Sequence, residues 1–422
     1  MMIENARGRT VGTVIRGIRT PIIRQGDKLD EIVTECVLNC AENEKIIFSD
    51  KDVIGVTEAV VARAQGNYVS VDDIAVDVKD KFGANNNSVN NADRTLELGV
   101  IFPILSRNRF AICLRGIALA AKKIYLMLSY PSDEVGNQLF DIELFEDKID
   151  LNELQSIKGG LSEKKYREIF GYPTHPFTGV DYIEYYKKLI EECGAEAEVI
   201  FTTNCHDIFN YTKNALVCDI HTRKSTKRRL IAKGVENAKV FGLEDICSKP
   251  VSGSEYGGYN ETYGLLGSNK ATETTIKLFP RDCEKFVSSL ADKLRTATKK
   301  NIEVMIYGDG AFKDSQGKIW ELADPVVSPA FTAGLSGVPN EVKIKYLADN
   351  QFKDLKGEEL DKAIKEYVKS KAPDLKASMA SQGTTPRKIT DLLGSLCDLS
   401  SGSGDKGTPV VLIQGYFDDI SS

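Results

Sequence analysis

Apolar residues recur at helical spacing in several stretches of the chain, and such stretches predict amphipathic helices. In the first stretch, residues 30–43, the shared face is formed by Leu29, Ile32, Val33, Cys36, Val37 and Cys40. Cys36 and Cys40 are therefore interpreted as core residues. The same spacing predicts helices at residues 162–169, 181–193, 283–298, 342–349, 357–370 and 389–399.

Short runs of β-branched and apolar residues predict buried strands between these helices. They lie at residues 53–56, 99–105, 124–130, 302–307 and 410–417. Strands and helices in this mixture predict an α+β fold, in which helices pack on mixed β-sheets.

The composition changes between residues 138 and 265, which carry more charge, more aromatic residues and all three histidines of the chain. This change predicts an inserted α/β region. The predicted domains are residues 1–137, 138–265 and 266–422, and the first and last of these form one core.

The overall charge is mildly acidic, with 55 Lys and Arg against 61 Asp and Glu, a net charge of −6. This balance argues against nucleic acid as a partner, because phosphate neutralisation needs a basic surface. No apolar run approaches the roughly 20 residues of a membrane span, and residues 1–9 lack a signal-peptide pattern. Nine cysteines without a CxxC pair indicate reduced thiols. We therefore expect a cytoplasmic protein with no membrane partner.

The loop before the last predicted strand combines glycines with small polar residues, over residues 401–409. Gly402, Gly404 and Gly407 allow tight turns that direct backbone N–H groups toward one anion. The loop is therefore either a phosphate site or a flexible hairpin connection.

Two aspartates, Asp133 and Asp309, follow predicted strands and stand far apart in the sequence. Hard carboxylate oxygens suit Mg²⁺ or Mn²⁺, which usually reach a nucleotide through one or two carboxylates. A turn role for Asp309 is equally compatible with its neighbours. The sequence contains no GxxxxGK[ST] motif and no kinase motif set, so the common phosphoryl-transfer families are not supported.

Three other polar groups have two interpretations each. Arg107 and Arg109 either bind a carboxylate or phosphate or belong to a solvated turn. Cys205-His206 and Cys218-Asp219-Ile220-His221 suggest zinc, but their spacing is poor and favours reduced, hydrogen-bonded side chains. The basic run at residues 223–229 is most simply a solvated helix face, with an anion-binding patch as the alternative.

Several segments carry a family resemblance. The chain has Pro-Ile-Ile-Arg at residues 21–24, Asp-Val-Ile-Gly-Val-Thr-Glu-Ala-Val-Val-Ala-Arg-Ala-Gln-Gly at 52–66 and Lys-Leu-Phe-Pro-Arg-Asp at 277–282. With the strand before Asp309 and residues 402–416, their order resembles the coenzyme F(420) gamma-glutamyl ligase family. The matched pieces cover residues 10–137 and 266–418, so the chain looks like a long, divergent branch with a central insert.

The resemblance implies a GTP- and metal-dependent ligase that joins L-glutamate to a carboxylate of a deazaflavin precursor. It implies a nucleotide site lined by Pro21, Ile22, Ile23, Arg24, Glu58, Ala59, Arg63, Asn137, Gly402, Ser403, Gly404, Asp405, Lys406 and Gly407. It also implies metal ligation by Asp133, Asp309 and Ser403, a catalytic role for Arg63 and Asp309, and a homodimer.

This chain departs from the family pattern at a few positions. Arg63 replaces a lysine, Asn137 stands one residue further on, Gly310 replaces a serine or threonine, and Ser403 stands where glutamine is common. The predicted function is a GTP- or ATP-dependent ligase that forms an amide bond between a carboxylate acceptor and L-glutamate through an acyl phosphate. The alternatives are a folate or other gamma-glutamyl ligase and, from another class, a non-catalytic nucleotide- or zinc-binding protein.

Overall fold

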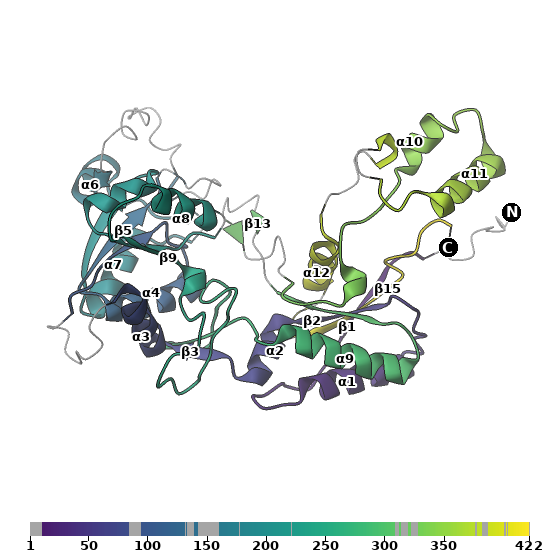
Figure 1. The fold of residues 1–422 in the computed structure, drawn as a ribbon, viewed down its shortest axis with the longest axis horizontal. Coiled ribbons are helices and arrows are strands. Elements are labelled where there is room, and N and C mark those ends of the chain that lie inside the picture. Colours follow the sequence, from purple (N-terminus) through teal and green to yellow (C-terminus); the bar gives the residue numbers. More distant parts are fainter. Residues whose placement is uncertain are drawn as a thin grey trace. The chain divides into compact units, whose positions relative to one another are not determined.

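The chain folds into two compact units, and the computed structural model in Figure 1 shows both. Unit 1 contains Met1–Val61, Asp282–Gly310 and Leu322–Ser422, and unit 2 contains Ala62–Arg281 and Ala311–Glu321. The structure describes residues 11–83, 94–130, 132, 139–141, 160–176, 178–220, 222–308, 312–313, 320–321, 328–375, 378–381, 387–400, 402 and 404–421.

Unit 1 is organised around a four-stranded mixed sheet with the strand order β1-β15-β2-β12. Its strands are β1 (Val14–Ile18), β2 (Val53–Thr57), β12 (Glu303–Tyr307) and β15 (Val410–Gln414). β2 and β12 run parallel, whereas β15 runs antiparallel to β1 and β2. Its helices are α1 (Leu29–Asn43), α9 (Cys283–Thr298), α10 (Ile344–Asp349), α11 (Gly357–Ser370) and α12 (Ile389–Ser400), with short 3₁₀ turns at Ala333–Leu335 and Met379–Ser381.

Both faces of the unit 1 sheet are covered, because every residue of β2 and β12 is buried. Figure 1 shows α12 on one side of this sheet and α1 and α9 on the other. On the α12 side, Val53 and Met305 pack with Leu393 and Cys397. The packing there is tight, since a Cβ atom added at Gly55 would lie 2.6 Å from the Sγ atom of Cys397.

Unit 2 contains a six-stranded sheet with the order β6-β7-β5-β4-β8-β9, in which only β6 is antiparallel to its neighbour among the described pairs. Its strands are β4 (Glu97–Ile101), β5 (Lys123–Leu128), β6 (Leu161–Ser162), β7 (Glu196–Phe201), β8 (Asn214–Val217) and β9 (Lys239–Gly242). A smaller sheet joins β3 (Tyr68–Ser70), β10 (Asn269–Lys270) and β11 (Thr275–Lys277), and β13 (Phe312–Lys313) pairs with β14 (Trp320–Glu321).

The helices of unit 2 cover both faces of the large sheet. They are α3 (Val71–Phe82), α4 (Arg109–Ala120), α6 (Glu163–Phe170), α7 (Tyr182–Glu192) and α8 (Arg223–Ala232), with 3₁₀ turns η3 (Cys205–Asn210) and η4 (Leu243–Asp245). Leu98 and Val100 belong to a core with residues of α3, α4 and α7, whereas Ile101 and Val217 pack with Ile208 of η3 and Leu230 of α8. Alternate residues of one strand therefore serve opposite cores.

The predicted α+β class is confirmed, as are most of the predicted helices and strands. The helices predicted at 30–43, 283–298 and 357–370 match α1, α9 and α11 within one residue. The interpretation of Cys36 and Cys40 as core residues was wrong, because both are only half-buried. The buried residues of α1 are spaced four apart and form one face of the helix, next to the two cysteines. They are Leu29, Val33, Val37 and Ala41.

The strand predicted at residues 99–105 is shorter, since β4 ends at Ile101. Phe102 takes a left-handed φ of 50°, and Pro103 has no N–H group with which to extend the ladder. The sheet that contains β7, β8 and β9 of the predicted insert also contains β4 and β5, which precede residue 138. The predicted domain boundaries, residues 1–137, 138–265 and 266–422, stay a prediction.

Candidate functional site

Four strand ends of unit 1 meet at one edge of its sheet. The register pairs Ile18 with Val410, Val410 with Val56, and Thr57 with Tyr307. The last residues of β1, β2 and β12 and the first residue of β15 therefore lie at the same edge of the sheet. The segments that continue from these ends are the ones in which the predicted site residues stand.

Two backbone hydrogen bonds attach the terminal loop to this edge. The Thr20 amide donates to the carbonyl of Gly407 at 3.2 Å, and the Thr57 amide donates to the carbonyl of Pro409 at 3.0 Å. Pro21–Arg24 begin directly after Thr20, and Glu58 directly follows Thr57. The structure thus brings together three predicted segments, two from the start of the chain and one from near its end.

The terminal loop is a closed turn with its own hydrogen bonds. Gly402 and Thr408 exchange backbone hydrogen bonds of 3.2 and 3.1 Å, and the Gly407 amide donates to the carbonyl of Gly404 at 2.9 Å. Gly407 has a φ of 63°, which favours glycine. The amides of Asp405 and Lys406, at the exposed centre of this turn, donate to no residue that the structure describes. Two adjacent amides at a turn can bind an anion.

The segment after β1 buries one side chain and exposes its neighbours. Ile23 is buried, whereas Ile22 is 81% exposed, and Pro21 and Arg24 are exposed too. The amide of Arg24 donates to the Oδ2 atom of Asp27 at 2.6 Å, which closes a turn. This turn fixes the backbone of Arg24 and leaves its side chain exposed to a ligand.

Glu58 is the first residue of α2 (Glu58–Gln65) and is only 3% exposed. Cys283, the first residue of α9, lies close to it in the same unit. Burial and the nearby charge of Glu58 raise the pKa of the Cys283 thiol to about 12. Glu58 therefore lies at the site edge but within protein packing, and its contact with a nucleotide stays a prediction.

The other predicted site residues fall into two groups. Ala59 is half-buried on α2, and Arg63 is exposed on the same helix, beyond the boundary between the units. Asp133, Asn137, Asp309, Gly310 and Ser403 lie outside the described residues. β12 ends at Tyr307, at the edge of the sheet described above. Asp309 follows two residues later in the sequence. The metal ligands implied by the resemblance thus stay predictions.

The cysteines and histidines of unit 2 give no support to the zinc alternative. Within the described ranges, no group of three or more His, Cys, Asp or Glu side chains is placed to hold a metal ion. Cys205 and Cys218 are fully buried, and all nine cysteines are free thiols, as predicted. His206 places its Nε2 atom 3.1 Å from the carbonyl of Arg229. His221 lies outside the described residues.

The arginines and the basic run of unit 2 have mixed environments. Arg109 is buried and donates to the carbonyl of Leu266 at 3.3 Å, while Arg107 is exposed. In the basic run, Arg223 and Lys227 form ion pairs with Glu244, whereas Lys224 and Arg228 are exposed. The sequence pattern did not reveal this pairing, because Glu244 is distant in the chain.

A mixed sheet with packed helices, whose strand ends bring three loop segments together at one edge, defines an α+β protein. The sequence profile of the F(420)-0:gamma-glutamyl ligase family matches residues 17–415, so the chain belongs to this family. Family membership supports an enzyme of the ligase class with small-molecule substrates. A comparison with curated proteins finds no match. Among the described helices, none has the length and apolar character required to cross a bilayer.

Proposed function

We propose that this protein is a nucleotide- and divalent-metal-dependent ligase that forms an amide bond between a carboxylate acceptor and L-glutamate. The observation that carries the proposal is the meeting of residues 20–24, 57–59, 402 and 404–409 at one edge of the unit 1 sheet. A nucleoside triphosphate, GTP or ATP, needs such a composite site, because its phosphates and its base contact different segments.

The described residues have distinct roles in this proposal. The amides of Asp405 and Lys406 donate hydrogen bonds to phosphate oxygens, and the exposed side chains of Lys406 and Arg24 add positive charge. Ile22, with 81% of its surface exposed beside the loop, offers an apolar face to the base or the ribose. Arg63 balances charge that develops during the reaction.

The metal would be held by Asp309, with Asp133 and Ser403 as the further oxygen ligands that the resemblance implies. Asp309 suits this role because it follows β12, whose last residue pairs with Thr57 at the site edge. A bound divalent metal supplies neutralisation of the triphosphate charge.

The chemistry consists of two group transfers. First, a carboxylate oxygen of the acceptor attacks the γ-phosphorus, the bond between that phosphorus and the β,γ-bridging oxygen breaks, and a nucleoside diphosphate leaves. Next, the amino group of L-glutamate attacks the carbonyl carbon of the acyl phosphate. The amine loses a proton, and inorganic phosphate leaves with the electron pair of the carbon–oxygen bond. The protein contributes mainly positioning and charge stabilisation to both steps.

The proposal is tested by Asp309→Ala, with Asp292→Ala as the matched control. Asp292 is an exposed aspartate on α9 of the same unit. We expect wild type and Asp292→Ala to release phosphate from GTP or ATP only with Mg²⁺ or Mn²⁺ and an acceptor. Asp309→Ala should lose about 10²–10³-fold in rate, as does removal of a comparable electrostatic group.

A panel of acceptors with labelled L-glutamate identifies the product and separates an F(420)-type precursor from folate or other gamma-glutamyl acceptors. Metal-independent phosphate release that Asp309→Ala leaves unchanged would contradict the proposal. Nucleotide binding without labelled product on any acceptor would instead identify a non-catalytic nucleotide-binding protein.

A further inference from the structure

The large sheet of unit 2 has the strand arrangement of a doubly wound α/β domain. Its five parallel strands stand in the order β7-β5-β4-β8-β9. The chain proceeds outward from β4 to β5 and β7, then returns across the sheet to β8 and continues to β9. The order therefore reverses between β4 and β8, and in open parallel sheets ligands bind beyond the carboxyl ends of the strands at such a switch point.

The connections after β4 and β8 start side by side and continue to opposite faces of the sheet. The amide of Cys218, directly after β8, donates to the carbonyl of Ile101 at 2.8 Å. The chain after β4 continues into α4, which packs in the core of Leu98 and Val100. The chain after β8 continues into α8, whose Leu230 belongs to the opposite core. This divergence is the geometry that opens a ligand crevice in doubly wound sheets.

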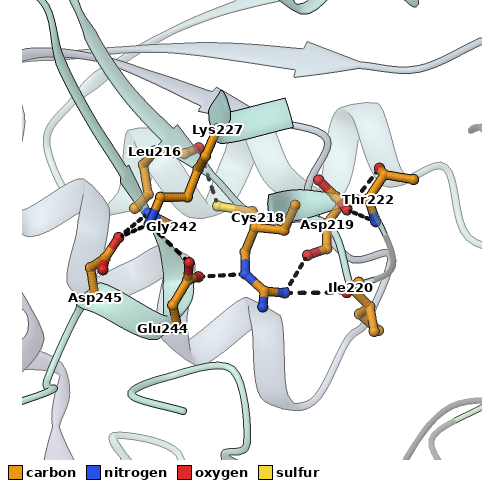
Figure 2. Close-up of polar contacts among 10 residues, drawn as sticks. Leu216, Cys218, Asp219, Ile220, Thr222, Lys227, Gly242, Glu244 and Asp245 are labelled. Carbon is orange, nitrogen blue, oxygen red and sulfur yellow. Dashed lines mark hydrogen bonds and ion pairs between the residues drawn. The ribbon is translucent and has the colours of Figure 1, made fainter. Parts of the chain in front are cut away.

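The loop after β8 is held rigidly by its own contacts, several of which Figure 2 shows. The Oδ1 atom of Asp219 accepts hydrogen bonds from the amide and the hydroxyl of Thr222, at 2.6 and 2.9 Å. Arg223 donates to the carbonyls of Asp219 and Ile220, at 3.0 and 3.2 Å, and forms an ion pair with Glu244. These contacts define the orientation of the Asp219 carboxylate.

Two buried polar atoms in and beside this loop lack a hydrogen-bond partner among the described residues. The Oδ2 atom of Asp219 is buried and accepts no hydrogen bond from any residue that the structure describes. Burial raises the pKa of Asp219 to about 6, despite the bonds from Thr222. On the second turn of α8, Thr226 is 1% exposed, and its buried Oγ1 atom likewise has no hydrogen-bond partner in the described part of the chain. Buried polar atoms without a hydrogen-bond partner are rare in folded proteins, and a bound ligand is one explanation for them.

The charges around the loop restrict the ligand class. The hydrogen bonds and ion pairs of this loop involve three carboxylates and two cations: Asp219, Glu244, Asp245, Arg223 and Lys227. Both cations are already paired with Glu244. The connection after β4 starts with Phe102-Pro103-Ile104-Leu105, which has no glycine to cradle a phosphate. A phosphate group is therefore disfavoured, and a hydroxyl or ammonium group is favoured.

We propose that unit 2 has a second ligand site at the switch point between β4 and β8, where Asp219 accepts a hydrogen bond from the hydroxyl or ammonium group of a small, non-phosphorylated ligand. This site is separate from the edge of the unit 1 sheet, and it does not depend on the proposed ligase reaction. Its recognition chemistry is a single buried carboxylate oxygen, so a neutral or cationic donor binds and an anion does not.

The test is a calorimetric titration of the full chain with two sets of probes. Adenosine and guanosine supply neutral hydroxyl donors, and L-lysine and ethanolamine supply ammonium donors. Each set is titrated into wild type, Asp219→Asn and Asp207→Asn. Asp207 is the matched control, because it follows β7 at the same edge and both its oxygens accept hydrogen bonds within its own loop, from Thr202 and Asn204.

We expect one probe set to bind wild type, Asp219→Asn to weaken that binding about tenfold or more, and Asp207→Asn to leave it unchanged. The far-ultraviolet circular dichroism and melting temperature of the variants report whether they are folded. A nucleoside can instead bind at the unit 1 site. In that case Asp219→Asn leaves its affinity unchanged, which distinguishes the two sites. The proposal is overturned if neither set binds, or if binding is the same in wild type and Asp219→Asn.

Discussion

The amide of Thr20 donates a hydrogen bond of 3.2 Å to the carbonyl of Gly407, although 386 positions separate the two residues. This bond lies just beyond the antiparallel pairing of β1 and β15, which ends at Ile18 and Val410. It holds the segment Pro21–Arg24 beside the turn of the terminal loop. A change in that turn should therefore act on both segments.

Gly407→Ala tests this coupling. Gly407 has a φ of 63°, and an alanine in the left-handed region costs about 1 kcal/mol of folding free energy. We expect a modest drop in the melting temperature and roughly tenfold weaker binding of GTP or ATP, measured by calorimetry with Mg²⁺ present. The affinity should fall because the turn that carries the Asp405 and Lys406 amides changes shape.

Gly253→Ala is the control for the backbone effect. Gly253 has a φ of 76°, and, as at Gly407, nothing lies within 4 Å of an added Cβ atom. It belongs to unit 2, whereas the terminal loop belongs to unit 1. A similar loss of stability with unchanged nucleotide affinity is expected. Equal weakening of nucleotide binding by both variants would show that the terminal loop has no special role.

Two buried tyrosines of the unit 2 core should respond oppositely to removal of the hydroxyl group. Tyr166 stacks on Phe201 with ring centroids 3.9 Å apart, and its buried hydroxyl has no hydrogen-bond partner in the described part of the chain. The hydroxyl of Tyr186 donates to the carbonyl of Ile104 and accepts from the amide of Ser106. We expect Tyr166→Phe to raise the free energy of unfolding by about 1 kcal/mol and Tyr186→Phe to lower it by about 1–3 kcal/mol.

Urea denaturation followed by circular dichroism measures both changes. The two variants remove the same atom from fully buried rings of one core, so each is the control of the other. A loss of stability in Tyr166→Phe equal to that in Tyr186→Phe would contradict the hydrogen-bond assignment.

Local patterns were sufficient to predict most elements of this chain. The helical spacing of apolar residues located α9 and α11, and the β-branched run located β2, because each pattern depends only on near neighbours. In the same way, glycine content predicted the turn at Gly407. Burial within a helix was less predictable, as Cys36 and Cys40 show, because it depends on which stripe faces the sheet.

The arrangement of strands could not be predicted from such patterns. The pairing of β15 between β1 and β2 joins residues near both ends of the chain, and the reversal between β4 and β8 depends on a crossover. The sequence therefore singled out Asp219 only as part of the segment at residues 218–221, in the zinc hypothesis. Its position at a switch point became visible only when the strand order was known.

Close packing at the centre of the unit 1 sheet predicts a compensating pair of substitutions. A Cβ atom at position 55 would lie 2.6 Å from the Sγ atom of Cys397. We expect Gly55→Ala alone to lower the free energy of unfolding by about 1–3 kcal/mol through overpacking. Combined with Cys397→Ala, which removes the clashing sulfur, it should cost less than the sum of the single changes.

Urea denaturation of the two single variants and the double variant measures this coupling. Gly12→Ala is the control, because nothing lies within 4 Å of an added Cβ atom there. Strict additivity would mean that the backbone of β2 moves away from Cys397 and relieves the clash.

The buried carboxyl group of Asp219 predicts a defined pH dependence of stability. Its pKa is raised from 3.8 to about 6 in the folded state, mainly by burial. Between about pH 4 and pH 6 the folded state therefore binds more protons at this group than the unfolded state, and stability falls as the pH rises. Asn at this position cannot titrate and keeps an oxygen for Thr222. The stability of Asp219→Asn relative to wild type should thus increase from pH 4 to pH 6 and level off above it.

A rise of the pKa from 3.8 to about 6 corresponds to about 3 kcal/mol, which is the upper limit of this gain. Melting temperatures of both proteins, measured at intervals between pH 4 and pH 8, test it. Thr222→Ala should extend the window to higher pH, because the Thr222 hydroxyl donates to Asp219 and so opposes the rise of its pKa. A difference between Asp219→Asn and wild type that stays constant with pH would mean that the carboxyl group is solvated. The buried acceptor on which the second site depends would then be absent.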